Sequence, residues 1–591
     1  MDLPNPEDDS REDDTLALGL DLGTTFSGVS HGLWRGSLRN GPRTIVTWPN
    51  YHEEAPKTPT QISYRTANEF CWGIQEAGTK NVISWFKLLL MNSEDLEPAI
   101  RYCEHIFNAL MAMQESNKMA SELVGDYLKG LLAHAYSCIR RETGDNYVDT
   151  KPIHLIFTVP AIWKESAIQR MKDAIEHSGA LGPRPNGIPA TTYKFITEPE
   201  AAALAAFQVF IGWDTLKPGM TFVVADIGGG TVDCISYIVN EGDSFQLQEV
   251  VEGDGALCGS TFLDSAFRES VKQKILDQWG LTWNDVDPDD QERVFQWWEK
   301  HKRIFDGSEW HPEAIKLVKK DGERIQVNYT PKEIGDLFDT VKPRIEELVE
   351  HQVNEVHRKT LRNPNFIVLV GGFGKSPYLY ESLKRKYLGR ITILREQGDG
   401  PWSSVSRGAV MFGMGSQVVV KSRVARYSYG YAVHHLYEDR VHDPRDKVWD
   451  LERGCFMAKD QMVWIIKRGD DIATCESNTL PYEIRYHHRE RGCKEISANI
   501  WKSERADPPN RLPDLEADDK SKTMTGIRIT TPAVETLPQI TEHGVTSYVF
   551  EYDLTMEVLG ASVHFSATWV GDRSREITQK KNLTVILGGD S

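Results

Sequence analysis

Two stretches of the chain share one pattern of apolar and polar residues. Residues 16–27 read LALGLDLGTTFS, and residues 221–233 read TFVVADIGGGTVD. In each stretch an apolar run predicts a buried strand, which reaches Asp21 or Asp226 and then breaks into Gly and Thr. The two aspartates lie 205 residues apart (226 − 21). This spacing of similar units indicates an internal duplication.

Between and after these stretches, strand patterns alternate with helix patterns. LIFTVPAIW at 155–163 predicts a buried strand, and KESAIQRMKDAIEHSGA at 164–180 predicts a helix. FITEPEAAALAAF at 195–207 joins a short strand to an Ala-rich helix, and FIVLVGGFGKSP at 366–377 is a strand that ends in a Gly-rich turn. Alternation of this kind is typical of an α/β fold.

After about residue 416 the pattern changes to period two. Apolar residues alternate with polar ones from Phe550 to Val558 and from Val563 to Trp569, on either side of a turn at Leu559–Gly560. This predicts an antiparallel hairpin, with a further strand from Leu583 and an exposed loop at 503–522. We therefore expect three segments: an acidic disordered tail at 1–15, a two-lobed α/β domain at 16–415 and an all-β domain at 416–591.

Composition narrows the function classes. The 591 residues are 40% hydrophobic and 26% charged, as in a globular protein without membrane helices, and the acidic N-terminus is no signal peptide. The eight cysteines are scattered and lack metal-ligand spacing, so we expect reduced thiols in a cytoplasmic protein rather than a zinc site or a disulfide framework. A net charge of −18 argues against a nucleic-acid partner.

The repeated turn carries the chemistry of phosphate binding. Gly allows backbone N–H groups to approach phosphate oxygens, Thr adds hydroxyl donors, and Asp supplies a carboxylate for Mg²⁺. One such turn is as typical of a plain strand-to-helix loop as of a nucleotide site, but two copies in matching contexts favour the nucleotide site. The chain contains no GxxxxGK[ST], so the site is not a P-loop.

Five segments in order complete a family pattern: DLGTTFS, FTVPAIW, ITEPEAAALAA, ADIGGGTVD and IVLVGGFGKSP. The chain thereby resembles the heat-shock protein 70 chaperone family over roughly residues 16–415. It is similar to a divergent branch found in fungi and represented in animals by type 12 members, and the cues for that branch are Lys57, Pro59, Thr60, WFKLLL at Trp85, LCGSTF at Leu257 and GGF at Gly371. The resemblance implies a duplicated, actin-like (ribonuclease H-like) ATPase domain with two lobes.

The resemblance also implies a site for ATP or ADP with Mg²⁺. Asp21 and Asp226 match the carboxylates that hold hydrated Mg²⁺. Glu198 matches an acid that orders metal-bound water, and Lys87 matches a lysine that orients the attacking water, so with Asp226 and Thr231 they form the expected catalytic set. The remaining nucleotide contacts implied by the family are Gly23, Thr24, Thr25 and Phe26 in the first turn, Gly228, Gly229, Gly230 and Thr231 in the second, Glu299, Lys302 and Arg303 in the adenosine helix, and Gly371, Gly372 and Lys375 in the last turn.

Four departures from the family pattern concern the base site and communication between domains. Lys375 replaces an arginine over the base, and lysine has no planar surface for stacking. Ile168 replaces an arginine that follows the switch proline, Pro160, and Trp402 replaces an aspartate near the cleft. The apolar interdomain linker is replaced by QVVVKSRVARYSYGY. Hydrolysis can survive these changes while its coupling to the second domain is lost.

The resulting hypothesis is a slowly ATP-hydrolysing, chaperone-like protein. Its β domain resembles a peptide-binding β-sandwich, although an unrelated sandwich has the same pattern, and because the chain stops at Ser591 we expect no helical lid. Expected partners are extended polypeptide and co-chaperones, and no membrane. Two alternatives stay open, a non-hydrolysing ATP sensor or scaffold and a sugar-kinase-type phosphotransferase.

Overall fold

The computed structural model describes most of the chain from residue 15 onward. The described ranges are 15–33, 41–51, 53–66, 69–74, 79, 81–144, 146–185, 187–212, 216–240, 245–309, 312–319, 322–415, 418–473, 477–518, 521–559, 562–570 and 585–586. The expected acidic tail at 1–15 thus lies almost entirely outside the described residues. Two compact units are present, residues 1–419 and 420–589, and each is described by itself.

The first sheet of the first unit is built around β1 (Leu16–Leu22), which is buried along its whole length. The strand order is β3-β2-β1-β8-β9, with β4 also on β2. β1 runs antiparallel to β2 and parallel to β8, and β8 runs parallel to β9. The bounds are β2 Phe26–Leu33, β3 Arg43–Thr44, β4 Thr58–Pro59, β8 Ile153–Val159 and β9 Thr192–Thr197.

The second sheet of this unit repeats that arrangement. β10 (Thr221–Ile227) runs antiparallel to β11 (Val232–Asn240) and parallel to β15 (Phe366–Val370). β16 (Thr392–Arg395) extends the parallel side and β12 (Phe245–Ala256) the antiparallel side. Thus β1, β2, β8 and β9 correspond to β10, β11, β15 and β16. The predicted duplication and the α/β fold class are confirmed.

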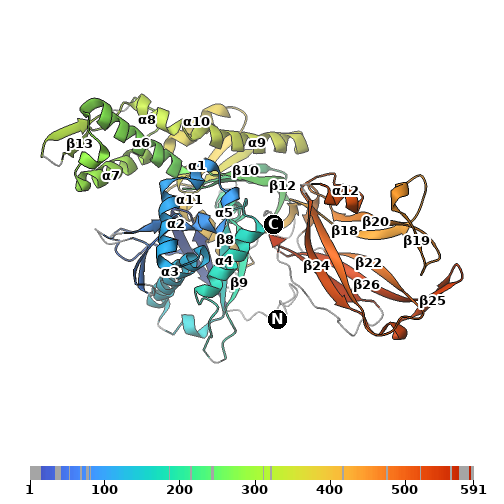
Figure 1. The fold of residues 1–591 in the computed structure, drawn as a ribbon. Coiled ribbons are helices and arrows are strands. Elements are labelled where there is room, and N and C mark those ends of the chain that lie inside the picture. Colours follow the sequence, from blue (N-terminus) through green and yellow to red (C-terminus); the bar gives the residue numbers. More distant parts are fainter. Residues whose placement is uncertain are drawn as a thin grey trace. The chain divides into compact units, whose positions relative to one another are not determined.

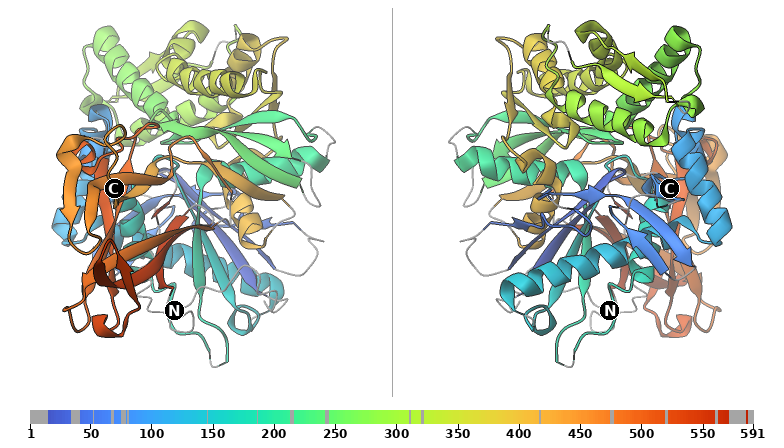
Figure 2. Two further views of the ribbon diagram at one scale, coloured as in Figure 1. Left: turned by 90° about the vertical axis from the view of Figure 1, so that its right-hand side faces the viewer. Right: turned by 90° about the vertical axis from the view of Figure 1, so that its left-hand side faces the viewer.

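Helices cover both sheets (Figures 1 and 2). α11 (Gly400–Gly413) packs on β1, β2 and β8 and against α5 (Glu198–Gly212), while α9 (Lys342–Thr360) packs on β10, β11 and β12. The second lobe has its own apolar core, which includes Phe267 and Trp298. The other helices of this unit are α1 Pro98–Arg101, α2 Glu104–Ser116, α3 Ala120–Thr143, α4 Glu165–His177, α6 Ser260–Trp279, α7 Pro288–Ile304, α8 Pro331–Phe338 and α10 Pro377–Lys386. Short strands complete it: β5 Gln61–Thr66, β6 Glu69–Trp72, β7 Ile83–Ser84, β13 Ile315–Val318 and β14 Arg324–Val327.

The second unit is strand-rich, as the period-two pattern predicts. One sheet has the order β19-β20-β18-β23-β24 and the other the order β22-β26-β27-β28, with β25 on β26. Side chains from both sheets share one core, among them Tyr429, Ile500 and Phe550. The bounds are β17 Val418–Val424, β18 Ser428–Leu436, β19 Lys447–Asp450, β20 Cys455–Ile466, β21 Asp471–Ala473, β22 Ser477–His487, β23 Glu495–Ser503, β24 Ser521–Thr530, β25 Gln539–Glu542, β26 Val545–Leu559, β27 Ser562–Trp569 and β28 Val585–Ile586.

The predicted hairpin is β26 with β27, which pair antiparallel with the inward alternation that the sequence shows. β28 pairs with β27 and supplies the further strand. The predicted exposed loop at 503–522 is wrong in part: α12 (Leu512–Glu516) forms there and Leu515 is fully buried, while β24 already begins at Ser521. An apolar residue among Pro, Asp and Glu anchors the segment, because one buried Leu side chain contributes about 2 kcal/mol.

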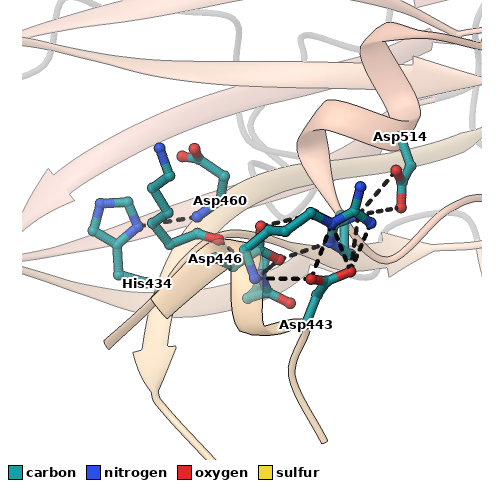
Figure 3. Close-up of polar contacts among 9 residues, drawn as sticks. His434, Asp443, Asp446, Asp460 and Asp514 are labelled. Atoms are coloured by element: carbon teal, nitrogen blue, oxygen red, sulfur yellow. Dashed lines mark hydrogen bonds and ion pairs between the residues drawn. The ribbon is translucent and has the colours of Figure 1, made fainter. Parts of the chain in front are cut away.

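A salt-bridge network holds the segment between β18 and β20 onto α12 (Figure 3). Arg511 donates through Nε and Nη2 to both oxygens of Asp446, at 2.6 and 2.8 Å, and through Nη1 to Asp514. Gln461 Nε2 also donates to Asp446, at 2.9 Å. The Arg511 guanidinium is the largest cause that lowers the pKa of Asp446. The segment that carries β19 is therefore fixed to the rest of the second unit.

Two further observations concern membrane-spanning helices and the cysteines. Across the residues that the structure describes, no helix combines the length and apolar character needed to cross a membrane. Within the described ranges, no disulfide involves Cys103, Cys138, Cys234, Cys258, Cys455 or Cys493, and Cys475 lies outside those ranges.

Candidate functional site

The two Gly/Thr turns of the first unit lie against each other. The first turn connects β1 to β2 and the second connects β10 to β11. A Cβ added to Gly229 would lie 2.0 Å from Thr25 Oγ1, and one added to Gly230 would lie 2.7 Å from Thr24 Oγ1. The turns can approach this closely only because positions 229 and 230 lack side chains. The structure thus brings together the residues in which the sequence predicts the phosphate site.

Both predicted metal-facing aspartates lie at this junction. Asp21 is 3% exposed and Asp226 is 7% exposed, and each is the penultimate residue of a buried central strand. Gly371, in the turn after β15, has φ +80°, and a Cβ there would lie 2.3 Å from Asp226 Oδ1. The last predicted Gly-rich turn therefore borders the same carboxylate, and a side chain at position 371 would displace it.

Lys87 and Glu198 form a buried ion pair. Lys87 lies in a 3-10 helix (Phe86–Leu90) and Glu198 is the first residue of α5, and Lys87 Nζ donates to Glu198 Oε1 at 2.6 Å. Lys87 is 2% exposed, and its ammonium also lies 5.2 Å from the centre of the Trp163 ring. Two residues that the sequence places 111 positions apart are therefore brought into direct contact.

Two charged residues of this region were not among the predicted site residues. Lys57 Nζ donates to Asp21 Oδ2 at 2.5 Å, and its side chain is 11% exposed. Asp233 is 1% exposed, and its Oδ1 accepts a hydrogen bond from the backbone N–H of Ala161 at 3.3 Å. Asp233 is the last residue of the DIGGGTVD motif, so the motif itself could have identified it as a site residue. In the sequence Lys57 is only a cue for the family branch that the chain resembles, and no motif assigns it to the site.

Burial and mutual repulsion shift the titration of these acids. Burial raises the pKa of Asp226 well above its usual value, and the charge of Glu198 adds to the shift. Burial and Glu198 likewise raise the pKa of Asp233 to about 7. Burial raises the pKa of Glu198, although Lys87 opposes this. Burial by itself would lower the pKa of Lys57, but the Asp21 carboxylate reverses the sign and raises it. Like charges crowded in a buried space favour binding of a cation.

The predicted adenosine helix is α7, and its charged residues contact each other and α6. Lys302 Nζ donates to Asp264 Oδ1 at 2.7 Å and also to Glu299. Arg303 Nη2 donates to Glu299 Oε2 at 3.1 Å. Lys302 is 8% exposed, whereas the Arg303 side chain is 62% exposed. The contacts of these three residues place them together on α7, and their role toward a base stays a prediction.

The last Gly-rich turn lies beside a tryptophan. A Cβ on Gly372 would lie 3.2 Å from Trp402 Nε1, and the rings of Trp402 and Phe26 meet edge to face at 5.5 Å. Lys375 Nζ bonds Asp399 Oδ1 at 2.7 Å and lies 6.0 Å from the Trp402 ring centre. Trp402, one of the departures from the family pattern, therefore borders both Phe26 of the first turn and the turn at 371–372. Ile168, another departure from that pattern, is fully buried in α4.

Comparisons with known proteins agree with this geometry. A family model described as "Hsp70 protein" matches residues 17–392, and a model described as "Domain of unknown function (DUF8568)" matches residues 423–503. Heat shock 70 kDa protein 12A of Mus musculus is 22% identical over an alignment of 548 residues, with coverage of 76% of this chain and 77% of that protein. The protein of the same name from Homo sapiens is 23% identical over 549 residues, with the same coverage of both chains. The heat shock cognate HSP70 protein of Trypanosoma brucei brucei is 25% identical over 392 residues, covering 63% of this chain and 53% of that protein.

Proposed function

Because the chain belongs to the Hsp70 protein family, with its actin-like ATPase domain, we propose that it binds ATP and ADP with Mg²⁺ and hydrolyses ATP slowly as a chaperone-like protein. One observation carries the proposal. Gly229 and Gly230 lie against Thr25 and Thr24, so two turns rich in backbone donors face one another. Such turns cradle phosphate oxygens.

The acidic residues present fit a hydrated Mg²⁺. This ion keeps several of its waters and is commonly bound through one or two carboxylates and the substrate phosphates. Asp21 and Asp226 would hold it from the two lobes, and when bound it would supply positive charge to the phosphate oxygens. The raised pKa values of Asp226 and Asp233 support this assignment, since a cation relieves the repulsion among buried carboxylates.

The remaining residues would bind and position. Backbone N–H groups of the two turns would stabilise negative charge that develops on the γ-phosphoryl oxygens, together with the Thr231 hydroxyl. The Lys87–Glu198 pair would orient the attacking water, because its two side chains fix each other. Adenosine would contact Glu299, Lys302, Arg303, Gly371, Gly372 and Lys375.

The second unit would bind extended polypeptide weakly. Its two sheets share an apolar core and present strand edges to which an extended peptide can add through backbone hydrogen bonds. Co-chaperones and a cytoplasmic location belong to the same proposal. The buried Ile168 and the altered linker favour weak coupling between ATP and peptide.

The experiment is phosphate release from Mg·ATP, measured with and without unfolded peptide or small sugars. We expect slow release that sugars do not accelerate and that Lys87→Ala lowers. ATP binding without release would replace the proposal with a non-hydrolysing sensor. Transfer of phosphate to a sugar would replace it with a phosphotransferase, which needs an aspartate base beside the acceptor hydroxyl.

A further inference from the structure

The predicted phosphate site contains more buried carboxylates than buried ammonium groups. Four carboxylates are almost fully buried there, belonging to Asp21, Glu198, Asp226 and Asp233. Two lysine ammonium groups lie among them, those of Lys57 and Lys87. With all six groups ionised, the formal charge is −2 (−4 + 2). An isolated buried charge is strongly disfavoured. Each lysine therefore neutralises part of the carboxylate charge and influences which ions the site can bind.

The two lysines serve different acids. Lys87 pairs with Glu198 at 2.6 Å and Lys57 pairs with Asp21 at 2.5 Å. Among the described residues, no ion pair reaches Asp226 or Asp233. Of the two carboxylates that the proposed function assigns to the metal, Asp21 already has a fixed ammonium partner, and among the described residues no ion pair supplies one to Asp226.

Local structure holds the Lys57 ammonium in this position. The lysine directly precedes β4, which pairs with the start of β2 at Ser27 and Thr58. A Cβ on Gly28 would lie 3.0 Å from Lys57 Cγ, so the lysine stem packs on the strand that follows the first Gly/Thr turn. The ammonium therefore lies at the base of that turn and is mostly shielded from water, where a charge acts more strongly than at the surface.

We propose that Lys57 is a built-in counter-ion of the nucleotide site and makes nucleotide binding by this chain weakly dependent on Mg²⁺. The inference rests on the proposed function. A fixed ammonium beside Asp21 offsets part of the carboxylate charge that repels the phosphates when no metal is bound, and it competes with Mg²⁺ for that carboxylate. Lys57 is thus a positioning and specificity residue, which sets how much of the phosphate charge the protein itself neutralises.

The test measures affinity for a fluorescent ADP analogue in EDTA and in MgCl₂, so that turnover plays no part. The quantity compared is the ratio of the two dissociation constants. For the wild-type chain we expect Mg²⁺ removal to weaken binding by less than about tenfold, which is about 1.4 kcal/mol. For Lys57→Met, which keeps the stem and removes the charge, we expect the ratio to rise at least about tenfold above the wild-type ratio.

Two variants control for the loss of a buried lysine as such. Lys118→Met removes an ammonium that pairs with Asp126 at 2.6 Å in a similarly buried setting outside the phosphate site, and its ratio should equal that of the wild type. Lys57→Arg keeps the positive charge and should stay near the wild-type ratio. In the absence of nucleotide, MgCl₂ should raise the melting temperature of Lys57→Met more than that of the wild type, because Asp21 is freed.

The outcomes separate this inference from the proposed function. Binding of the analogue with a ratio of more than about tenfold in the wild type overturns the role of Lys57, even if Lys57→Met does not fold. Equal ratios in wild type and Lys57→Met do the same, and the proposed function then stands. No binding by the wild type in either buffer overturns both.

Discussion

The contact between the two Gly/Thr turns leads to a quantitative prediction for Gly229→Ala. The new Cβ would lie 2.0 Å from Thr25 Oγ1, and ordinary contact begins at 3.4 Å, so the turns must separate by about 1.4 Å (3.4 − 2.0). Thr25 is on the other lobe's turn and is held by the backbone bond from Thr60 N to Thr25 O at 2.8 Å, so the strain falls on the closed site.

Overpacking of this kind costs about 1–3 kcal/mol. If nucleotide binds only when the turns are together, binding carries that penalty, and the ADP dissociation constant should rise about 5- to 150-fold. The assay is isothermal titration of Mg·ADP into the wild type, Gly229→Ala and Gly41→Ala. Gly41 is the matched control, because a Cβ there would have no atom within 4 Å.

A dissociation constant for Gly229→Ala within about twofold of the wild type would refute the reasoning, since it would show that the closed contact is not the binding state. A melting temperature measured on the same samples separates this case from unfolding. Gly229→Ala should keep a cooperative transition, because opening of the turns relieves the clash.

Three other predictions test the roles of single residues and of the second unit. Lys87→Ala should lower phosphate release with little loss of ATP affinity, because orienting water is a transition-state task, and normal release would show that the lysine is misplaced. Burial raises the Asp233 pKa from 3.8 to about 7. The contribution of this group to folding stability is therefore fully present below pH 3.8 and is lost as the pH rises toward about 7. Between about pH 5 and pH 8 the melting temperature of the nucleotide-free chain should accordingly fall less in Asp233→Asn than in the wild type. A labelled apolar peptide should bind weakly with ADP and with ATP alike by fluorescence anisotropy, and a tenfold weakening by ATP, about 1.4 kcal/mol, would contradict weak coupling.

The fold class could be predicted from the sequence because the two patterns that indicate it, apolar runs and period-two alternation, are local. The apolar runs before Asp21 and Asp226 become the central strands β1 and β10, and the alternation from Phe550 to Trp569 becomes the β26–β27 hairpin. A strand that is buried on both faces must be apolar throughout, whereas a strand with one face in water alternates, so the two sheet types differ in the sequence itself.

The candidate site was predictable only where a motif spans its residues. The glycines and threonines of the two turns are given by their motifs, but the pairing of Lys57 with Asp21 depends on how β4 lies along β2. No local pattern encodes that approach of segments 36 residues apart. The buried Leu515 escaped prediction for a similar reason, since one apolar residue in a polar segment has no periodicity. The domain bounds and the roles of the site residues stay predictions.

Hydrogen exchange measured by mass spectrometry, with and without Mg·ADP, tests the central claim most directly. The account predicts that nucleotide slows amide exchange in the peptides that contain residues 21–27 and 226–233 together, because the backbone N–H groups of both turns would bind phosphate. Unchanged exchange in both peptides at saturating Mg·ADP, or slowing confined to residues 420–589, would contradict it.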